Sequence, residues 1–267
     1  MEALDPATLA LLVANAFVAG AIDAIAGGGG LLTVPAMALA GIDPVAAVAT
    51  NKLNATFGAA SATIAFARAG HIDLRRQWPL ALTAGLGGLA GAVALAHVPR
   101  ALVAEALPVA LVAVVAYFAL APGFGDKDRP PRLSLAAFGA TLVPLIGFYD
   151  GVFGPGAGSF YMAGFVALCG YGALKASAYT KLCNLSSNLA SLALYALAGH
   201  VVWQVGLVLA PAQILGAQLG ARLAIANGAR LIRPLLIAVS SALALRLALA
   251  PGQPVGEAMR SLWAQFF

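Results

Sequence analysis

Long apolar runs alternate with short polar stretches along nearly the whole chain. A helix needs about 20 consecutive apolar residues to cross a bilayer. The runs lack the alternation of in-facing and out-facing residues that a membrane β-barrel requires. The pattern predicts helical segments at residues 7–26, 31–41, 44–67, 77–96, 101–121, 133–153, 157–170, 173–197, 203–224 and 231–249. We therefore expect an all-α membrane protein whose second and seventh segments are short and follow glycine-rich breaks.

The composition fixes the surroundings of these helices. Hydrophobic residues make up 61% of the chain, charged residues only 9%, and the mean hydropathy is +0.92. A soluble domain usually contains about a quarter of charged residues, so the helices are expected to face the lipid bilayer. The net charge of +5 does not indicate a nucleic-acid partner, because most of the cations lie at helix ends and they do not form a basic stripe.

The chain contains an internal repeat. Matched residues stand 129 positions apart in most of each half and 127 apart near its start. This predicts a first transmembrane repeat at 7–121, a cytoplasmic linker at 122–132, a second repeat at 133–249 and a C-terminal tail at 250–267. The matched pairs are Asp23/Asp150, Gly27/Gly154, Gly41/Gly170, Lys52/Lys181, Gly70/Gly199, His71/His200, Gly87/Gly216 and Gly91/Gly220.

The loop cations predict that the two repeats are inverted. Five crossings per half, with the N-terminus outside, place nearly all of the loop cations on the inner side, as the positive-inside rule requires. The inner cations are then Arg68, Arg75, Arg76, Lys127, Arg129, Arg132, Lys175, Arg222, Arg230 and Arg233, against Arg100 and Arg260 outside. Inverted repeats are a common architecture of secondary transporters.

Lys52 and Lys181 are the first candidate site residues. Each lies about 12 Å into its helix, and inversion would bring both ammonium groups near the middle of the bilayer. A charge at that depth is usually interior and functional, although a lysine near a helix end can also reach the interface. Polar side chains accompany both lysines, and they could line a substrate path or form interhelical hydrogen bonds. They are Asn51 and Asn54 in the first half, and Thr180 and Asn184 in the second.

The glycine-rich breaks are the second candidate. Each precedes a new helix, expected to begin near Leu31 and near Ser159, and a helix N-terminus presents unpaired N–H groups that favour anions. Close packing of small residues is the alternative explanation. The candidate ligands at the breaks are Gly28, Gly29, Gly30, Gly156 and Gly158.

Asp23 and Asp150 precede the two breaks by about one helical turn. They could carry a coupling proton, pair with Lys52 and Lys181, or hold the broken helix ends. An intramembrane aspartyl protease is not expected, because Tyr149-Asp150 and the Gly-Phe-Gly-Asp run at 123–126 occur in the reverse of that family's order. The three histidines form no ligand cluster, so we expect no metal, no cofactor and no enzymatic activity.

These motifs resemble the sulfite exporter TauE/SafE family of membrane proteins over residues 8–250. The resemblance rests on the runs 19–30, 34–35 and 50–53, and on 150–156, 180–181, 184, 187–189 and 199–200. It implies a multi-pass carrier in the cell inner (plasma) membrane that moves sulfite or an organosulfonate, often outward. By motif it implies that the glycine breaks, Asn51, Lys52, Lys181 and Asn184 line the site.

We therefore expect a secondary transporter that exports a small anion by alternating access, with the two halves rocking about a central site. An anion channel or receptor, and a non-transporting membrane partner of another enzyme, are the alternatives. Assembly into a homo-oligomer is left open.

Overall fold

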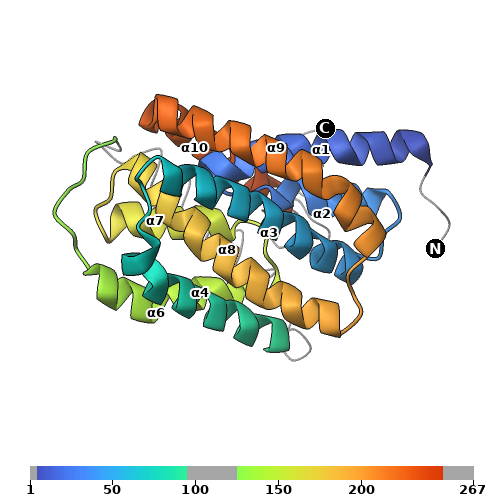
Figure 1. The fold of residues 1–267 in the computed structure, drawn as a ribbon, viewed down its shortest axis with the longest axis horizontal. Helices are drawn as coiled ribbons and strands as arrows, with labels where there is room; N and C mark the ends of the chain where they lie inside the picture. Colours follow the sequence, from blue (N-terminus) through green and yellow to red (C-terminus); the bar gives the residue numbers. More distant parts are fainter. Residues whose placement is uncertain (1–4, 95–124, 249–267) are drawn as a thin grey trace, which may run out of the picture.

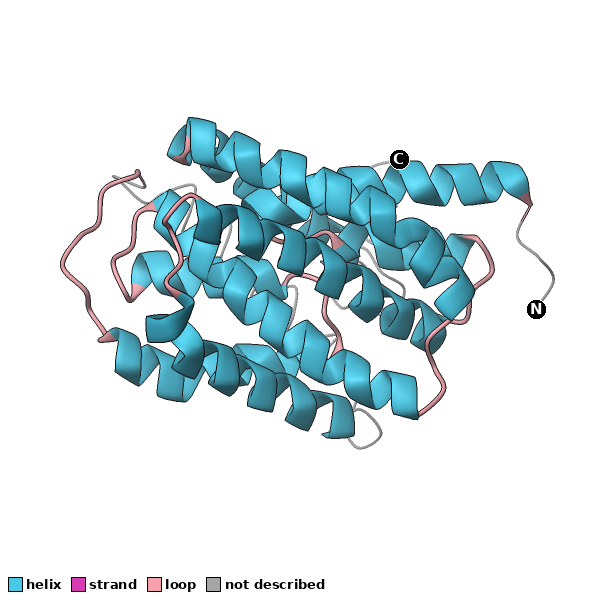
Figure 2. Ribbon diagram, in the orientation of Figure 1, coloured by secondary structure: helices cyan, strands magenta, loops and turns pink. Residues whose placement is uncertain are grey.

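The computed structural model describes residues 5–94 and 125–248, and this part of the chain is helical without any strand (Figure 2). The expected segment at 101–121, the tail at 250–267, Arg100 and Arg260 lie outside the described residues. Every other expected segment is a helix, with ends within three residues of those expected. The helices are α1 (Pro6–Ala26), α2 (Gly30–Leu39), α3 (Pro44–Arg68), α4 (Leu74–Ala94), α6 (Leu135–Val152), α7 (Ala157–Ala167), α8 (Ala173–Leu197), α9 (Trp203–Asn227) and α10 (Ala229–Ala248).

Local chemistry fixes several helix ends. Asp5 and Asp43 accept hydrogen bonds from the first free N–H groups of α1 and α3, and a proline follows each of them. Ser134 caps α6 in the same way. Such caps satisfy N–H groups that have no partner inside a helix. The linker residues 125–134 contain no helix.

The helices form a bundle with α3 and α8 at its centre (Figure 1). In the figure, α3 runs from right to left and α8 from left to right, so the two repeat-matched helices are antiparallel. Helices α1 and α9 pack on one side of this central pair, and α4 and α6 on the other. Each outer pair therefore combines one helix from each half of the sequence.

Glycines make these outer pairs tight, and they do so at repeat-matched positions. A Cβ on Gly216 or Gly220 of α9 would lie 1.9 and 2.2 Å from the carbonyl oxygens of Phe17 and Ala21 in α1. A Cβ on Gly87 or Gly91 of α4 would lie 2.2 and 2.0 Å from the oxygens of Pro144 and Phe148 in α6. Both pairs therefore use Gly-x-x-x-Gly spacing for close helix packing.

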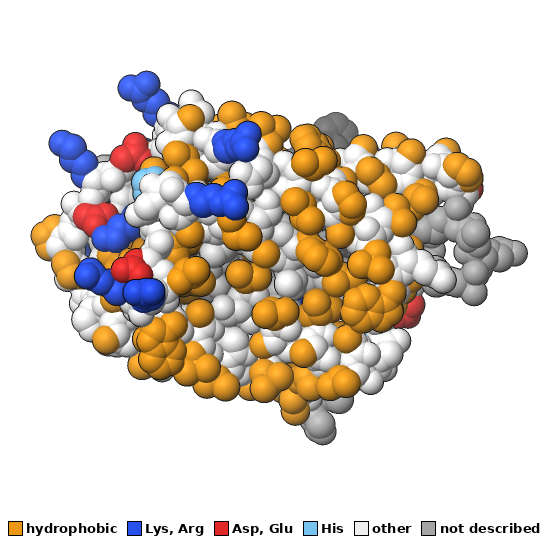
Figure 3. All heavy atoms as spheres, viewed as in Figure 1, with side chains coloured by type: hydrophobic (Ala, Val, Ile, Leu, Met, Phe, Trp, Pro, Cys, Tyr) orange, Lys and Arg blue, Asp and Glu red, His pale blue; other side chains and the backbone are white. Residues whose placement is uncertain are grey.

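The outer surface suits a bilayer. Large apolar side chains such as Leu11, Leu86, Leu145 and Leu215 are more than half exposed, and orange side chains cover much of the face in Figure 3. By length and composition, α1, α6 and α9 can each cross a membrane. Helices α3 and α8 are at least as long as these three. Their polar residues face the centre of the bundle and lower their mean hydropathy.

Exposed cations gather at one end of the molecule, on the left of Figure 3. This end contains the linker, which contacts the α7–α8 loop through Arg129 N–H to Gly170 O (2.7 Å) and the start of α10 through Ala229 N–H to Asp126 (2.8 Å). By the positive-inside rule, we predict that this is the cytoplasmic end. The reciprocal contacts and the antiparallel central helices are those that an inverted repeat would produce, and inversion across a membrane stays a prediction.

Candidate functional site

The two glycine breaks meet at the centre of the bundle. Gly27 has φ +74°, and Gly154 and Gly156 have φ +86° and +89°, conformations that glycine adopts without strain. A Cβ on Gly27 would lie 2.7 Å from the Cα of Gly158, and a Cβ on Gly158 would lie 2.7 Å from the Cα of Gly27. The backbones of the two halves are therefore in direct contact, the α1–α2 break against the α6–α7 break.

A small cavity lies beside this contact, between the breaks and the central helices. Its volume is about 20 Å³, which leaves room for about one water molecule. Polar groups from both halves line it together with small side chains. The lining residues are Asp23, Gly28, Gly30, Asn51, Ala55, Ala59, Asp150, Gly154, Gly156, Ala157, Gly158, Asn184 and Asn188.

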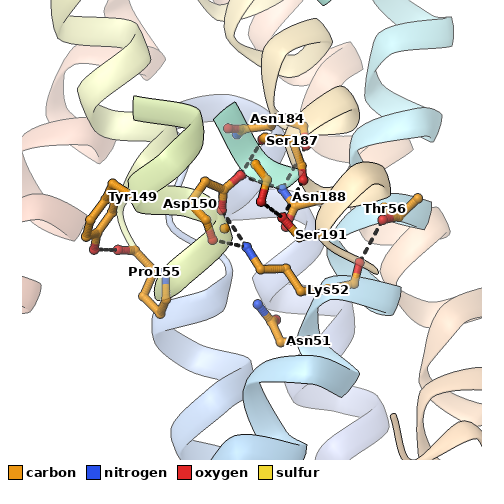
Figure 4. A network of polar contacts seen from close by, with 12 residues as sticks. Asn51, Lys52, Thr56, Tyr149, Asp150, Pro155, Asn184, Ser187, Asn188 and Ser191 are labelled. Atoms are coloured by element: carbon orange, nitrogen blue, oxygen red, sulfur yellow. Dashed lines mark hydrogen bonds and ion pairs between the residues drawn. The ribbon is translucent and has the colours of Figure 1, made fainter. Parts of the chain in front are cut away.

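The first ion pair joins Lys52 of α3 to Asp150 of α6, across the two halves (Figure 4). The ammonium lies 2.8 Å from one carboxylate oxygen and also donates to the main-chain oxygen of Asp150. The other carboxylate oxygen accepts hydrogen bonds from Ser187 and, at 3.0 Å, from Asn188. The side chains of Lys52 and Asp150 are 0% and 2% exposed, so this pair is withdrawn from solvent.

The second ion pair joins Lys181 of α8 to Asp23 of α1, at 2.9 Å. It is the repeat-matched counterpart of the first. The other oxygen of Asp23 accepts hydrogen bonds from Gly28 and Gly29, both at 3.0 Å. These two N–H groups belong to the break itself, so Asp23 also holds the start of α2. Its side chain is 17% exposed.

The amide side chains at the cavity differ in how firmly they are held. Asn51 accepts a hydrogen bond from Thr33 of α2 through its oxygen, which leaves its amide N–H groups near Gly30. Asn184 is 4% exposed, and its side-chain oxygen has no hydrogen-bond partner. A buried polar atom without a partner is uncommon in a folded protein and marks this cavity as a place where a polar ligand or water would be stabilised.

The structure brings most, and not all, of the expected site residues to the cavity. Gly28, Gly30, Gly156, Gly158, Asn51, Asn184, Asp23 and Asp150 line it. Lys52 and Lys181 do not line it, because each ammonium is turned onto an aspartate that does. Of the alternatives for Asp23 and Asp150, both residues pair with a lysine in this conformation, and Asp23 also holds the start of α2.

Gly29, Asn54 and Thr180 do not line the cavity in this conformation. Gly29 faces α1, where a Cβ would lie 2.7 Å from the oxygen of Ala19. Asn54 and Thr180 are buried within the bundle, away from the cavity lining. Asn54 donates to the oxygen of Thr50 in its own helix, at 3.4 Å. Three residues advance a helix by about 300°, so Asn51 and Asn54 share one stripe only loosely.

Two residues that contact Asp150 were not expected as site residues. Ser187 and Asn188 follow Asn184 by three and four positions and therefore lie on the same helix face. The signal was present in that spacing, but nothing in the sequence showed which carboxylate the face would meet. The described residues contain no group of three His, Cys, Asp or Glu that could hold a metal ion.

The sequence was compared with known protein families. A model of the family described as sulfite exporter TauE/SafE matches residues 12–247. The chain belongs to the sulfite exporter TauE/SafE family. No solved structure gives a significant match to it.

Individual TauE/SafE relatives match over nearly their whole length. The chain is 50% identical over 247 residues to probable membrane transporter protein ORF9 of Sinorhizobium sp, covering 92% of this chain and 95% of the relative. It is 44% identical over 232 residues to a probable membrane transporter protein of Haemophilus influenzae, covering 87% and 91%. It is 42% identical over 244 residues to probable membrane transporter protein YfcA of Escherichia coli K12, covering 91% of each chain. This TauE/SafE protein is accordingly a multi-pass membrane transporter and not an enzyme.

Proposed function

We propose that this TauE/SafE protein is an alternating-access carrier that exports a small oxyanion, sulfite or an organosulfonate, through the central cavity. The observation that carries the proposal is the pair of buried lysines, Lys52 and Lys181, each held at the meeting point of the two glycine breaks. Buried ammonium groups in a membrane protein normally serve a substrate or ion path. The matched family's description supports sulfite as the first substrate to test.

The cavity is suited to an oxyanion by hydrogen-bond donors. The amide nitrogen of Asn51 lies near Gly30, and the residues where α2 and α7 begin line the same small space. Helix N-termini and amide donors at a repeat interface are typical of carriers for anionic substrates. We propose that these donors bind the oxygens of the substrate while a lysine neutralises its charge.

Apolar clusters toward both ends of the bundle support alternating access. Toward the outer end, Leu12, Ala16 and Met37 belong to one buried apolar cluster, beyond which a crevice of about 540 Å³ opens between α1 and α2. Toward the cytoplasmic end, Phe138 and Phe165 pack edge to face, with ring centroids 5.0 Å apart, inside a larger apolar cluster. We propose that this conformation is occluded and that the two clusters separate in turn.

The proposal is tested by flux into proteoliposomes. The panel is sulfite, methanesulfonate, sulfoacetate, sulfate and acetate, each measured as net uptake and as counterflow against trapped unlabelled anion. A carrier gives saturable uptake and counterflow, whereas a channel gives flux without counterflow. Lys181→Gln should abolish flux. Lys175→Gln is the matched control, since Lys175 lies on the same helix and pairs with Asp128 at the cytoplasmic surface.

Three results would contradict the proposal. They are normal flux in the Lys181→Gln protein, flux without counterflow, and the absence of flux for the whole panel. The last, with stoichiometric co-purification of a soluble protein, would favour a membrane partner of another enzyme.

A further inference from the structure

The charges at the cavity cancel before any substrate enters. Two carboxylates and two ammonium groups form two ion pairs, and the carboxylates, not the ammonium groups, line the space. An entering anion therefore first meets negative charge. To reach an ammonium group, the anion must replace a carboxylate in one ion pair, and the carboxylate left behind must be neutralised or remain as an uncompensated buried charge.

The two ion pairs are unequal in their capacity to open. Asp150 is 2% exposed and is held by side chains of three residues, Lys52, Ser187 and Asn188. Asp23 is 17% exposed and has one side-chain partner, Lys181. Its other donors are N–H groups, which also bind the carbonyl oxygen of a neutral carboxylic acid. Asp23 is thus the carboxylate with the more open surroundings and the one that can be protonated in place.

The repeat alignment shows why the pairs differ. Ser187 and Asn188 correspond to Gly58 and Ala59, which have no side-chain donor to offer Asp23. Gly58 cannot be replaced freely, because a Cβ there would lie 2.9 Å from the side-chain nitrogen of Gln213 in α9. The first half therefore keeps one carboxylate without the polar side chains that fix its counterpart.

Few other charges act on Asp23. Helix α8 contributes Lys181, α3 contributes Lys52, and α6 contributes Asp150 across the cavity. No ionisable side chain occurs in α2, and Tyr161 of α7 is engaged with the oxygen of Val143. Of the remaining charges on the packed helices, five lie near helix ends at the cytoplasmic side, namely Arg68, Lys175, Arg222, Arg230 and Arg233, and Arg246 lies near the opposite end of α10.

We infer that Asp23 is the proton-binding site of the carrier and that each anion moves together with one proton. This rests on the proposed function. A proton from the bulk phase binds a carboxylate oxygen of Asp23, and Lys181 exchanges the carboxylate for the substrate anion. No covalent bond forms or breaks except the new O–H bond. For a monoanion the buried charge stays zero, and Lys52–Asp150 stays closed throughout. An anion that accumulates inside the cell then leaves down its own gradient and takes a proton with it.

The test counts protons per anion in proteoliposomes that contain a trapped pH-sensitive dye, with the membrane potential clamped. Methanesulfonate is one probe, because a sulfonate stays ionised and any proton that moves is carried by the protein. Sulfite is the other, and for sulfite the informative quantity is the difference between wild type and Asp23→Asn. Because the anion's own ionisation is the same in both proteins, it cancels from this difference.

The expected result for wild type is one proton per methanesulfonate. In Asp23→Asn, the number of protons that move with each transported anion should fall by one for both anions. Asp73→Asn is the matched control, since Asp73 is exposed and pairs with Arg76 at the cytoplasmic surface, and it should leave the ratio unchanged. Infrared difference spectra of wild type on adding sulfite should show a new protonated carboxyl band, a readout that does not require the variant to fold.

The outcomes separate the two proposals. Anion flux with an unchanged proton count in Asp23→Asn, or sulfite binding without a new carboxyl band, would overturn this inference and leave the carrier standing. Absence of flux for every anion of the panel would overturn the proposed function and this inference with it.

Discussion

The Lys52–Asp150 and Lys181–Asp23 ion pairs occupy matched positions in the two halves, yet they differ in what surrounds them. Both pairs cross between the halves at nearly the same distance, 2.8 and 2.9 Å. The first is enclosed by Ser187 and Asn188, whereas the second ends on a glycine break and is partly exposed. The matched positions therefore keep the same charges, while the residues beside them enclose one pair and leave the other partly exposed.

The largest expected effect comes from removing the two lysines separately. Lys52→Met leaves Asp150 charged and buried, and breaking such a pair costs about 3–5 kcal/mol. Lys181→Met should cost less, about 1.5–3 kcal/mol, because Asp23 keeps two N–H donors and some exposure. Denaturant titration of the purified proteins in detergent measures both. Equal losses would show that the two pairs are equivalent, and the double variant Lys52→Met/Asp150→Asn should recover part of the first loss.

The contact between the two breaks gives the next effect. In Gly158→Ala the added methyl group meets the backbone of Gly27 at 2.7 Å, and overpacking of this kind costs about 1–3 kcal/mol. It should also reduce anion flux, since both ion pairs are placed by the breaks. Gly85→Ala is the control, because its Cβ would meet the nearest atom at 3.5 Å. A Gly158→Ala protein as stable and active as the control would mean that the breaks have no close contact.

Removing one donor from the enclosed pair sharpens the comparison. Asn188→Ala removes the 3.0 Å hydrogen bond that Asn188 donates to Asp150. The surroundings of Asp150 then resemble those of Asp23. The expected loss of stability is about 1–2 kcal/mol, measured by the shift in melting temperature in detergent. Asn227→Ala removes an exposed amide that only bonds its own helix, at 2.8 Å to Leu223 O, and should have almost no effect. A smaller shift for Asn188→Ala than for Asn227→Ala would argue against a structural role for the first pair.

The smallest expected effect on stability comes from the exposed ion pair Lys175–Asp128. Burial by itself would raise the pKa of Asp128, but the N–H of Gly172 and the ammonium of Lys175 outweigh it and hold that pKa below its ordinary value. A carboxylate with a depressed pKa in the folded state stabilises above its ordinary pKa, near 3.8, and loses this contribution as the pH falls through the depressed value.

Solvent screening limits this contribution to about 0–1 kcal/mol. The difference in melting temperature between wild type and Asp128→Asn should therefore be small at neutral pH and vanish in acid. A difference that grows on acidification would contradict the assignment.

Sequence reasoning predicted the helices well because one physical requirement dominates them. A backbone in lipid must satisfy its own hydrogen bonds, so each apolar run had to be helical, and proline, glycine and capping residues mark where the runs end. The glycine-rich breaks were equally clear from the sequence, and Gly27, Gly154 and Gly156 do adopt positive φ. The repeat spacing also identified both lysines and both aspartates as related pairs.

The sequence could not determine how those four charges are arranged. Pairing of Asp23 with Lys181 depends on the docking of α1 against α8, which is a property of the whole bundle. Spacing alone also places each side chain around its helix only coarsely, so the predicted site includes Asn54 and Thr180, whereas the cavity lining includes Asn188. The difference arises because a polar stripe on a central helix faces several neighbours, and only tertiary packing decides which residues come into contact.

The glycine seams between α1 and α9, and between α4 and α6, bear on how the protein could move. Sliding or separating two backbones in such close contact would lose dense van der Waals packing. We therefore expect the two helices of each pair to move together as one rigid unit. Each pair contains one helix from each half of the sequence. The boundary between the moving parts of the protein therefore does not coincide with the boundary between the two halves. If the protein is produced as two fragments divided within the linker, each fragment lacks one helix of each pair. Neither fragment should then be stable without the other.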